Sequence, residues 1–294
     1  MLRVEGLRKM YGTTVALDDV SFTVRPGELF GFVGANGAGK TTAMRIIMGV
    51  LSADSGTVTW RGSQPSRDTL RSFGYMPEER GLYQKMKVAD QVEYFGRLYG
   101  MAAPDARKSA DAWIERLGLA ERRNDEVQAL SLGNQQRAQL AVALVHDPQV
   151  LILDEPFSGL DPLAVDALAG VLAEKRDAGA PIIFSSHQLD LVERISDAVG
   201  IISSGRIVAT GPVDDVRERE GRSRLRVELR DAPPGWMDRL PGRVVDRPNP
   251  RIALLEPDGA DDQDVLRTAM AAGRLEHFGW ERPTLSEIFR EVVR

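Results

Sequence analysis

The sequence of 294 residues contains no cysteine and three histidines, so it offers neither disulfide bonds nor thiolate ligands for a metal. The histidines are scattered, which argues against a zinc site. No apolar run approaches the roughly 18–20 residues that cross a bilayer, and the N-terminal MLRVEGLRKMYG lacks the apolar core of a signal peptide. We therefore expect a soluble, cytoplasmic protein whose role at any membrane depends on a partner.

A strong charge of either sign is also absent. The formal net charge is −5, and acidic and basic residues are interspersed without a block of Lys or Arg. We therefore expect no nucleic-acid partner. The chain is 43% hydrophobic and 28% charged, a composition that excludes disordered and fibrous classes.

The order of short apolar runs predicts an α/β fold. LFGFV (29–33) is typical of a buried strand, and AMRIIMGVL (43–51) after a glycine-rich loop has helical spacing. VLIL (150–153) and PIIFSS (181–186) predict further buried parallel strands, separated by a helix at about 162–178. The composition changes after about residue 216, where a charged link precedes the alternating RLRVELR. We predict a first domain at 1–216 and a small α+β domain at 217–294.

A phosphate-binding loop stands between the first strand and its helix. GANGAGKT (34–41) fits the pattern G-x-x-x-x-G-K-[ST], in which backbone N–H groups surround a phosphate. Lys40 is then expected to bridge the β- and γ-phosphates, and Thr41 to offer its hydroxyl to Mg²⁺. The residues expected around the phosphates are Gly34, Ala35, Asn36, Gly37, Ala38, Gly39, Lys40, Thr41 and Thr42.

Two carboxylates follow the strand VLIL. Asp154 and Glu155 are expected at the carboxyl edge of the sheet, where α/β proteins bind ligands. Asp154 would hold Mg²⁺, and Glu155 would polarise a water molecule in line with the γ-phosphate. Taken alone, such a pair is more often a helix cap, and the phosphate loop is what favours the catalytic interpretation.

Five motifs in order resemble the ATP-binding subunit of ABC transporters. These are the phosphate loop, LSLGNQQR (130–137), the carboxylate pair, SGLD (158–161) and His187 after PIIFSS, and the resemblance covers residues 1 to about 215. It implies ATP and Mg²⁺ as cofactors. It also implies a P-loop NTPase (RecA-like) core with an antiparallel β subdomain and an inserted helical subdomain at about 80–130. The C-terminal domain resembles those appended to subunits of bacterial exporters.

The resemblance implies roles for residues outside the phosphate loop. Tyr11 fits the aromatic that stacks on adenine, although a tyrosine packed on the first sheet is an alternative. Ser131 and Gly133 match positions that contact the γ-phosphate of ATP held by a second copy, and Ser131 also suits a helix N-cap. Leu132 and Asn134 depart from the usual Leu-Ser-Gly-Gly-Gln, so we expect the contact to persist with altered strength.

Three further positions carry family roles. Asp161 ends the loop through which the two sites sense each other, and His187 matches the γ-phosphate sensor. Glu78 stands where the family usually has a glutamine that reaches Mg²⁺. A carboxylate also ligates Mg²⁺, but its charge is expected to weaken metal-free nucleotide binding. Glu79 as the ligand, or a solvated charge at Glu78, are the alternatives.

Residues 81–100 resemble the helical segment that receives a membrane subunit. Tyr83, Met86 and Tyr94 are candidate contacts there, or ordinary core residues.

Together these features predict a cytoplasmic ATPase subunit of an exporter, peripheral on the inner face of the cell membrane. Two copies close on two MgATP, with Glu155, His187 and Lys40 as catalytic residues, and closure drives a separately encoded membrane subunit. One alternative is a soluble ABC-type ATPase acting on ribosomes or DNA. Another is a nucleotide switch with slow or absent hydrolysis, which Glu78 and Leu132 keep open.

Overall fold

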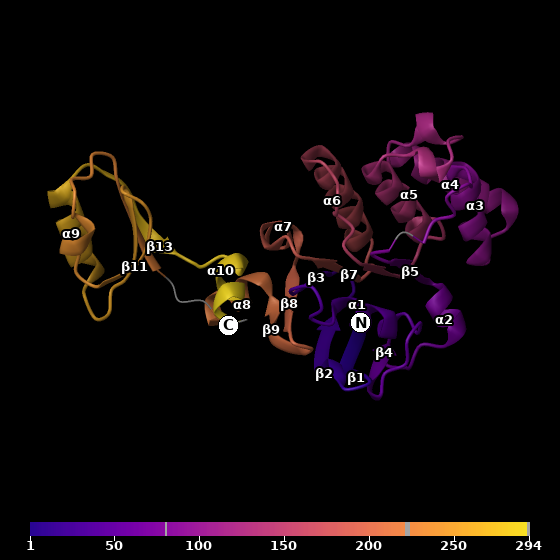
Figure 1. The fold of residues 1–294 in the computed structure, drawn as a ribbon, viewed down its shortest axis with the longest axis horizontal. Helices are drawn as coiled ribbons and strands as arrows, with labels where there is room; N and C mark the ends of the chain where they lie inside the picture. Colours follow the sequence, from indigo (N-terminus) through magenta and orange to yellow (C-terminus); the bar gives the residue numbers. More distant parts are fainter. Residues whose placement is uncertain (80, 221–223, 293–294) are drawn as a thin grey trace. The chain divides into compact units, whose positions relative to one another are not determined.

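The computed structural model describes residues 1–79, 81–220 and 224–292. They form two compact units, Met1–Val213 and Asp214–Arg294, drawn in Figure 1. Helix α8 (Val213–Glu220) contains the boundary that the sequence predicts at residue 216.

A six-stranded sheet forms the centre of the first unit, in the order β5-β6-β7-β3-β8-β9. Its first five strands are parallel, and β9 pairs with β8 as an antiparallel hairpin. Every residue of β3, β6 and β7 is buried, which explains why these strands show no alternation of apolar and charged residues. The strands are β3 (Leu29–Val33), β5 (Phe73–Met76), β6 (Val150–Leu153), β7 (Ile182–Ser186), β8 (Ala198–Ser203) and β9 (Arg206–Pro212).

A second, antiparallel sheet of three strands has the order β2-β1-β4. Its strands are β1 (Leu2–Tyr11), β2 (Thr14–Val24) and β4 (Ser55–Trp60). Helix α1 (Lys40–Ile47) packs buried residues such as Met44 and Ile47 into the hydrophobic core that this sheet shares with β3. The helix ends before the predicted residue 51, because Gly49 adopts a left-handed backbone (φ 67°) that terminates it.

Helices α5 and α6 cover the other side of the parallel sheet, whereas α2 packs Leu70 against the same core as α1, and α3 and α4 pack on α5. Figure 1 shows α5 and α6 on one side of that sheet and α1 on the other. A helical segment lies between β5 and β6, as the resemblance implies, and α5 connects it to β6. The helices are α2 (Arg67–Arg71), α3 (Val88–Leu98), α4 (Ala103–Arg116), α5 (Leu132–Leu144), α6 (Pro162–Asp177) and α7 (Leu189–Ile195), with 3₁₀ turns at Ala120–Arg122 and Val127–Ala129.

The second unit is an antiparallel sheet with helices, so the predicted α+β class is confirmed. Its strand order is β11-β12-β10-β13, and its core joins alternate residues of β10 to α9. Charged side chains occupy the other face of β10, where Arg226 pairs with Glu228 and Glu281. The elements are β10 (Arg224–Leu229), a 3₁₀ turn (Met237–Arg239), β11 (Arg243–Asn249), β12 (Ile252–Glu256), α9 (Asp262–Ala272), β13 (Leu275–Glu281) and α10 (Leu285–Val292).

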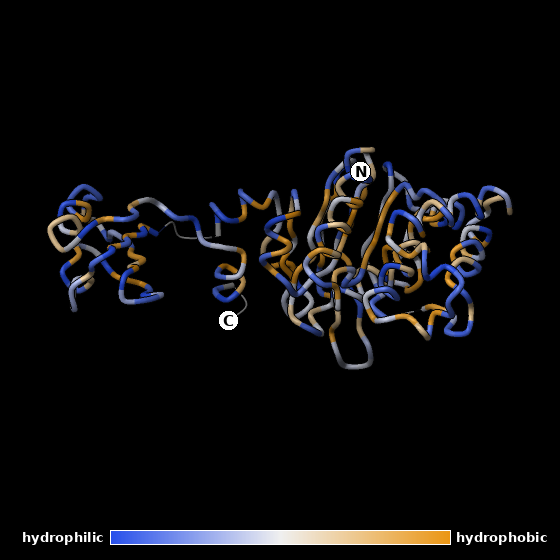
Figure 2. Tube along the Cα trace, turned by 90° about the horizontal axis from the view of Figure 1, so that it is seen from above, coloured by the Kyte–Doolittle hydropathy of each residue, from blue (hydrophilic) through white to orange (hydrophobic). Residues whose placement is uncertain are grey.

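In the first unit, long hydrophobic stretches run through the interior and hydrophilic stretches are common at the periphery (Figure 2). Within the described ranges, no helix is both long enough and apolar enough to cross a membrane.

A half-buried histidine just after α5 contacts strand β5. The ring of His146 stacks on Tyr99 with centroids 3.7 Å apart, and its Nε2 lies 3.2 Å from the carbonyl oxygen of Phe73. Burial lowers the pKa of His146 from 6.5 to about 4. The hydrogen bond to Phe73 and the charge of Asp147 oppose this shift without cancelling it, so His146 is neutral at physiological pH.

We expect His146 to make folding sensitive to mild acid. Because the unfolded chain binds a proton more tightly than the folded one, this contribution is complete above pH 6.5 and is lost as the pH falls from 6.5 toward 4. The full effect is at most about 3 kcal/mol. The measurement is the free energy of unfolding against pH for the wild type and for His146→Phe, which keeps an aromatic stack and cannot titrate. The variant should show a shallower slope over this range, and equal slopes would contradict the assignment.

Candidate functional site

A cavity of about 330 Å³ lies at the carboxyl edge of the parallel sheet. Four segments distant in sequence meet there: the start of β2, the loop after β3, the loop after β5 and the end of β6. The lining residues are Ala16, Asn36, Gly37, Ala38, Gly39, Lys40, Thr41, Thr42, Glu78, Asp154 and Glu155. The structure thus brings the predicted phosphate loop together with both carboxylates and Glu78.

The phosphate loop depends on its glycines. A Cβ on Gly34 would lie 2.5 Å from the carbonyl oxygen of Ile202, and one on Gly39 would lie 2.5 Å from that of Ala16. Gly39 also has φ 110°, which side chains rarely permit. Helix α1 begins directly after it at Lys40, so the free N–H groups and positive end of the helix face the cavity.

Lys40 is held against the loop. Its side chain is buried at 7% exposure, and Nζ donates to the carbonyl oxygens of Gly34 at 2.6 Å and Ala35 at 3.3 Å. Gly34 and Ala35 therefore do not line the cavity themselves but orient the ammonium group that does. A positive charge fixed at this point suits an anionic ligand.

One carboxylate oxygen of Asp154 accepts a hydrogen bond, and the other has no hydrogen-bond partner. Its Oδ1 accepts a hydrogen bond of 2.5 Å from the hydroxyl of Ser185, whereas its buried Oδ2 has no hydrogen-bond partner. A buried carboxylate oxygen without a donor is well suited to a cation. Thr41 and Glu78 line the same cavity, so these residue types fit Mg²⁺ with phosphate oxygens completing its shell. In the described part of the chain, no group of three or more His, Asp or Glu could hold a metal.

Glu155 occupies a strained turn at the end of β6. Its φ of 52° is unusual for a residue other than glycine, and such backbone costs about 1–3 kcal/mol unless its surroundings enforce it. Here the hydroxyl of Ser185 accepts from its N–H at 2.8 Å, and the side chain of Gln136 donates to its carbonyl at 2.9 Å. The strain is thus maintained by contacts on both sides of the residue.

The carboxylate of Glu155 points to His187, which lies beyond the cavity wall. Nδ1 of His187 is 2.9 Å from Oε2 of Glu155. Burial raises the pKa of the Glu155 carboxyl above its ordinary value, and the charges of His187 and Lys40 oppose this rise. A buried carboxylate oriented in this way can accept a proton from water.

Glu78 rather than Glu79 forms part of the cavity wall. Both side chains are exposed, but the lining includes Glu78 only. Of the two candidates, Glu78 is therefore the one that borders the same cavity as Thr41 and Asp154.

The LSLGNQQR segment lies outside this cavity. Ser131 is exposed and is the N-cap of α5, since its Oγ accepts from Asn134 N–H at 3.4 Å. Gly133 lies beside the SGLD loop, because a Cβ on it would meet the carbonyl oxygen of Gly159 at 3.6 Å. Asp161 ends that loop as the N-cap of α6, accepting from Ala164 N–H at 2.9 Å. None of these residues is among the described ones that line the phosphate cavity.

The predicted aromatic contacts are exposed. Tyr11 ends β1 with 50% exposure, and Ala16 of the neighbouring β2 lines the phosphate cavity. Tyr83 and Tyr94 are 52% and 37% exposed and pack edge to face, so the core alternative is wrong for both. Met86 is half-buried.

Sequence reasoning missed three buried polar residues: Ser185, Gln136 and Gln139. Ser185 interrupts the apolar strand PIIFSS, and the two glutamines interrupt the apolar side of α5 at helical spacing. A polar residue at a position where the pattern predicts burial needs a hydrogen-bond partner, and this could have marked all three residues in the sequence.

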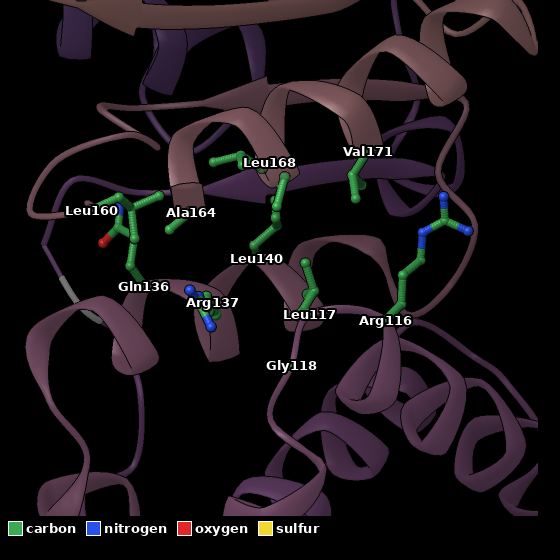
Figure 3. A pocket seen from close by; sticks show the side chains of 11 residues that line it. Arg116, Leu117, Gly118, Gln136, Arg137, Leu140, Leu160, Ala164, Leu168 and Val171 are labelled. Carbon is green, nitrogen blue, oxygen red and sulfur yellow. The ribbon is translucent and has the colours of Figure 1, made fainter. Parts of the chain in front are cut away.

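A second cavity, of about 170 Å³, separates α5 from α6 (Figure 3). Its wall is mostly aliphatic and includes Gln136. The lining residues are Arg116, Leu117, Gly118, Gln136, Arg137, Leu140, Leu160, Ala164, Ala167, Leu168 and Val171.

Comparison with known families matches both units. Residues 17–158 match the family described as ABC transporter, and residues 211–293 match the C-terminal domain of DrrA1-3-like ATP-binding proteins.

Two relatives match nearly the whole chain. The uncharacterized ABC transporter ATP-binding protein YhaQ of Bacillus subtilis (strain 168) is 35% identical over 302 residues, covering 100% of this chain and 98% of the relative. The daunorubicin resistance ATP-binding protein DrrA3 of Streptomyces coeruleorubidus is 30% identical over 303 residues, covering 99% and 95%. A solved structure of an ATP-binding subunit of an ABC transporter is 32% identical with a TM-score of 0.69, covering 74% of this chain and 92% of that one.

We expect Ser185→Ala to lower stability and to leave Asp154 less well oriented for the metal, so that nucleotide binding requires more Mg²⁺. The substitution removes the donor to Asp154 and leaves the N–H of Glu155 unpaired, which should cost about 1–3 kcal/mol of stability. Because Asp154 is then free to turn, the Mg²⁺ concentration required for nucleotide binding should rise roughly 10-fold. Denaturant unfolding and a Mg²⁺ titration of nucleotide binding measure the two effects.

Ser109→Ala is the matched control, since the Ser109 hydroxyl donates to the carbonyl of Val145 away from the site. It should lower stability without changing the Mg²⁺ requirement. An unchanged requirement in Ser185→Ala would contradict the role given to Ser185.

Proposed function

The chain belongs to the ABC transporter family of ATP-binding, ATP-hydrolysing subunits, and from this premise we propose that two copies close on two molecules of MgATP. Each copy binds one nucleotide in its phosphate cavity and covers the nucleotide of the other with Ser131 and Gly133. Closure and reopening would drive a separately encoded membrane subunit.

One observation carries the shared-site proposal. A single chain gathers the phosphate loop, both carboxylates and Glu78 around one cavity, but Ser131 and Gly133 lie outside that cavity. Ser131 and Leu132 start α5 in an exposed position, and Leu132 is an apolar side chain left 59% exposed. An exposed helix N-terminus is suited to a phosphate, and exposed apolar surface beside it is suited to a protein contact. ATP-binding cassettes of this family typically dimerise and pair with membrane subunits.

The residues of the cavity divide the catalytic work. The backbone of the phosphate loop and Lys40 would hold the triphosphate, and Thr41, Asp154 and Glu78 would hold Mg²⁺. When bound, the metal neutralises charge that develops on the phosphate oxygens. Glu155 would accept a proton from the attacking water, and His187 would orient its carboxylate and contact the γ-phosphate. Tyr11, half exposed at the end of β1, would stack on adenine.

Transport outward is the direction that we propose. Its support is the DrrA1-3-like C-terminal domain and the resistance protein DrrA3, which aligns with almost all of this chain. The exposed pair Tyr83 and Tyr94, beside a hollow whose wall includes Tyr83, Met86 and Lys87, offers a surface for the membrane subunit. The protein would then work at the inner face of the membrane through that partner.

Glu155→Gln should stop turnover and preserve binding. The amide cannot accept the proton, so the hydrolysis rate should fall at least about 100-fold. Because ATP then persists, the variant should elute from a sizing column as a dimer when MgATP is present and as a monomer when it is absent. Adding Lys40→Ala to the same chain should abolish the dimer peak. Undiminished hydrolysis by Glu155→Gln would contradict the assignment of Glu155 as the general base.

Complementation between two inactive variants tests the shared sites. Ser131→Arg blocks the contribution to the other copy's nucleotide, and Lys40→Ala blocks binding in its own cavity. Mixing them should produce heterodimers with one competent site, so activity should recover above that of either variant alone. Labelled subunits must first be shown to mix, and no recovery after proven mixing would contradict the shared-site proposal.

A further inference from the structure

Two buried glutamines on α5 reach the backbone of the catalytic cavity. Gln136 is 6% exposed, and its Nε2 donates to the carbonyl oxygens of Glu155 at 2.9 Å and Pro156 at 3.0 Å. Gln139 is 3% exposed, and its Nε2 donates at 2.5 Å to the carbonyl oxygen of Pro77, the residue before Glu78. Residues three apart lie on the same side of a helix. One face of α5 is therefore attached both to the turn at Glu155 and to the loop that carries Glu78.

Close packing is missing beside the attachment at Gln136. The cavity of about 170 Å³ in Figure 3 separates α5 from α6, and Gln136 extends from α5 toward the segment that carries Leu160. Aliphatic side chains such as Leu140 and Leu168 face this space from the two helices. Since a buried amide is unfavourable without hydrogen bonds, the two bonds from Gln136 hold α5 in register with the turn at Glu155.

The same bonds determine the direction of the Glu155 carboxylate. Glu155 has a left-handed backbone, its N–H is fixed by Ser185, and its carbonyl is fixed by Gln136. Release of the carbonyl would allow the turn to relax and to swing the carboxylate away from the position that His187 now defines.

We propose that Gln136 is a positioning residue that links the LSLGNQQR segment to the catalytic base of the same chain. Ser131 caps α5 about 8 Å along the helix axis from Gln136, so a displacement of the helix start moves Gln136 with it. A triphosphate of the second copy that seats on Ser131 would thereby set the orientation of Glu155. The inference rests on the proposed role of Glu155 as the base.

The test is the steady-state ATPase of Gln136→Met, which keeps the length of the side chain and loses both donors. We expect kcat to fall about 10- to 100-fold while KM for ATP stays within about twofold, because misplacement of the base affects the chemical step. Gln91→Met is the matched control. Gln91 is a fully buried glutamine whose Oε1 accepts from Tyr83 N–H, and it is not among the residues that line the cavity. The kcat of Gln91→Met should stay within about twofold of wild type.

A double-mutant cycle separates positioning from general packing. In the Glu155→Gln background, Gln136→Met should lower the residual rate less than about twofold, since the group it positions is already disabled. A further 10-fold loss in that background, or a fall in kcat equal to that of Gln91→Met, would overturn the inference. If Gln136→Met does not fold, Gln136→Asn, whose shorter amide cannot span the same gap, replaces it in both measurements.

The failure of this inference differs from the failure of the proposed function. An inactive Glu155→Gln together with normal kcat in Gln136→Met overturns the inference alone. Full turnover by Glu155→Gln overturns both the assignment of Glu155 as the catalytic base and the inference about Gln136.

Discussion

The parallel pairing of β6, β7 and β3 is the constraint on which the site depends. Parallel neighbours end at the same edge of a sheet, so the loop after β3 and the carboxylates after β6 meet at one cavity although the sequence separates them widely. His187 after β7 lies just beyond the wall of this cavity, with its Nδ1 2.9 Å from Oε2 of Glu155. The buried strands maintain that register, and the glycines of the phosphate loop allow the backbone to approach it. Charge neutralisation around a triphosphate then follows from the fold rather than from any single residue.

A second feature is that residues outside the cavity wall hold the backbone of the catalytic turn in place. The left-handed turn at Glu155 is enforced by Ser185 from β7 and by Gln136 from α5, neither of which lines the cavity. Ser185 also leaves one oxygen of Asp154 free for a cation. The N-terminus of the helix that begins with Ser131 is exposed, and the Gln136 side chain of that helix holds the backbone turn at Glu155 of the same chain.

Much of this arrangement could be predicted from the sequence, because glycine spacing, apolar runs and the residues after strand ends follow from local rules. The strands 29–33 and 150–153 lie where the apolar runs predict them, and Ser131 is a helix cap. The end of α1 was placed too late, since Gly49 ends the helix before the apolar residues do. Gln136 and Gln139 could not be assigned, because the partners of a buried amide depend on segments that only the fold brings near. Likewise, the sequence favours Glu78 but leaves Glu79 as an alternative, because which of two adjacent side chains lines a cavity depends on the fold.

The central claim is that two copies share each nucleotide. The most direct measurement is an experimental structure of the protein with Mg²⁺ and a non-hydrolysable ATP analogue. The account predicts a dimer in which Ser131 and Gly133 of one protomer contact the γ-phosphate that lies against Lys40 of its partner. A solitary protomer that encloses its own nucleotide, with Ser131 remote from any phosphate, would contradict it.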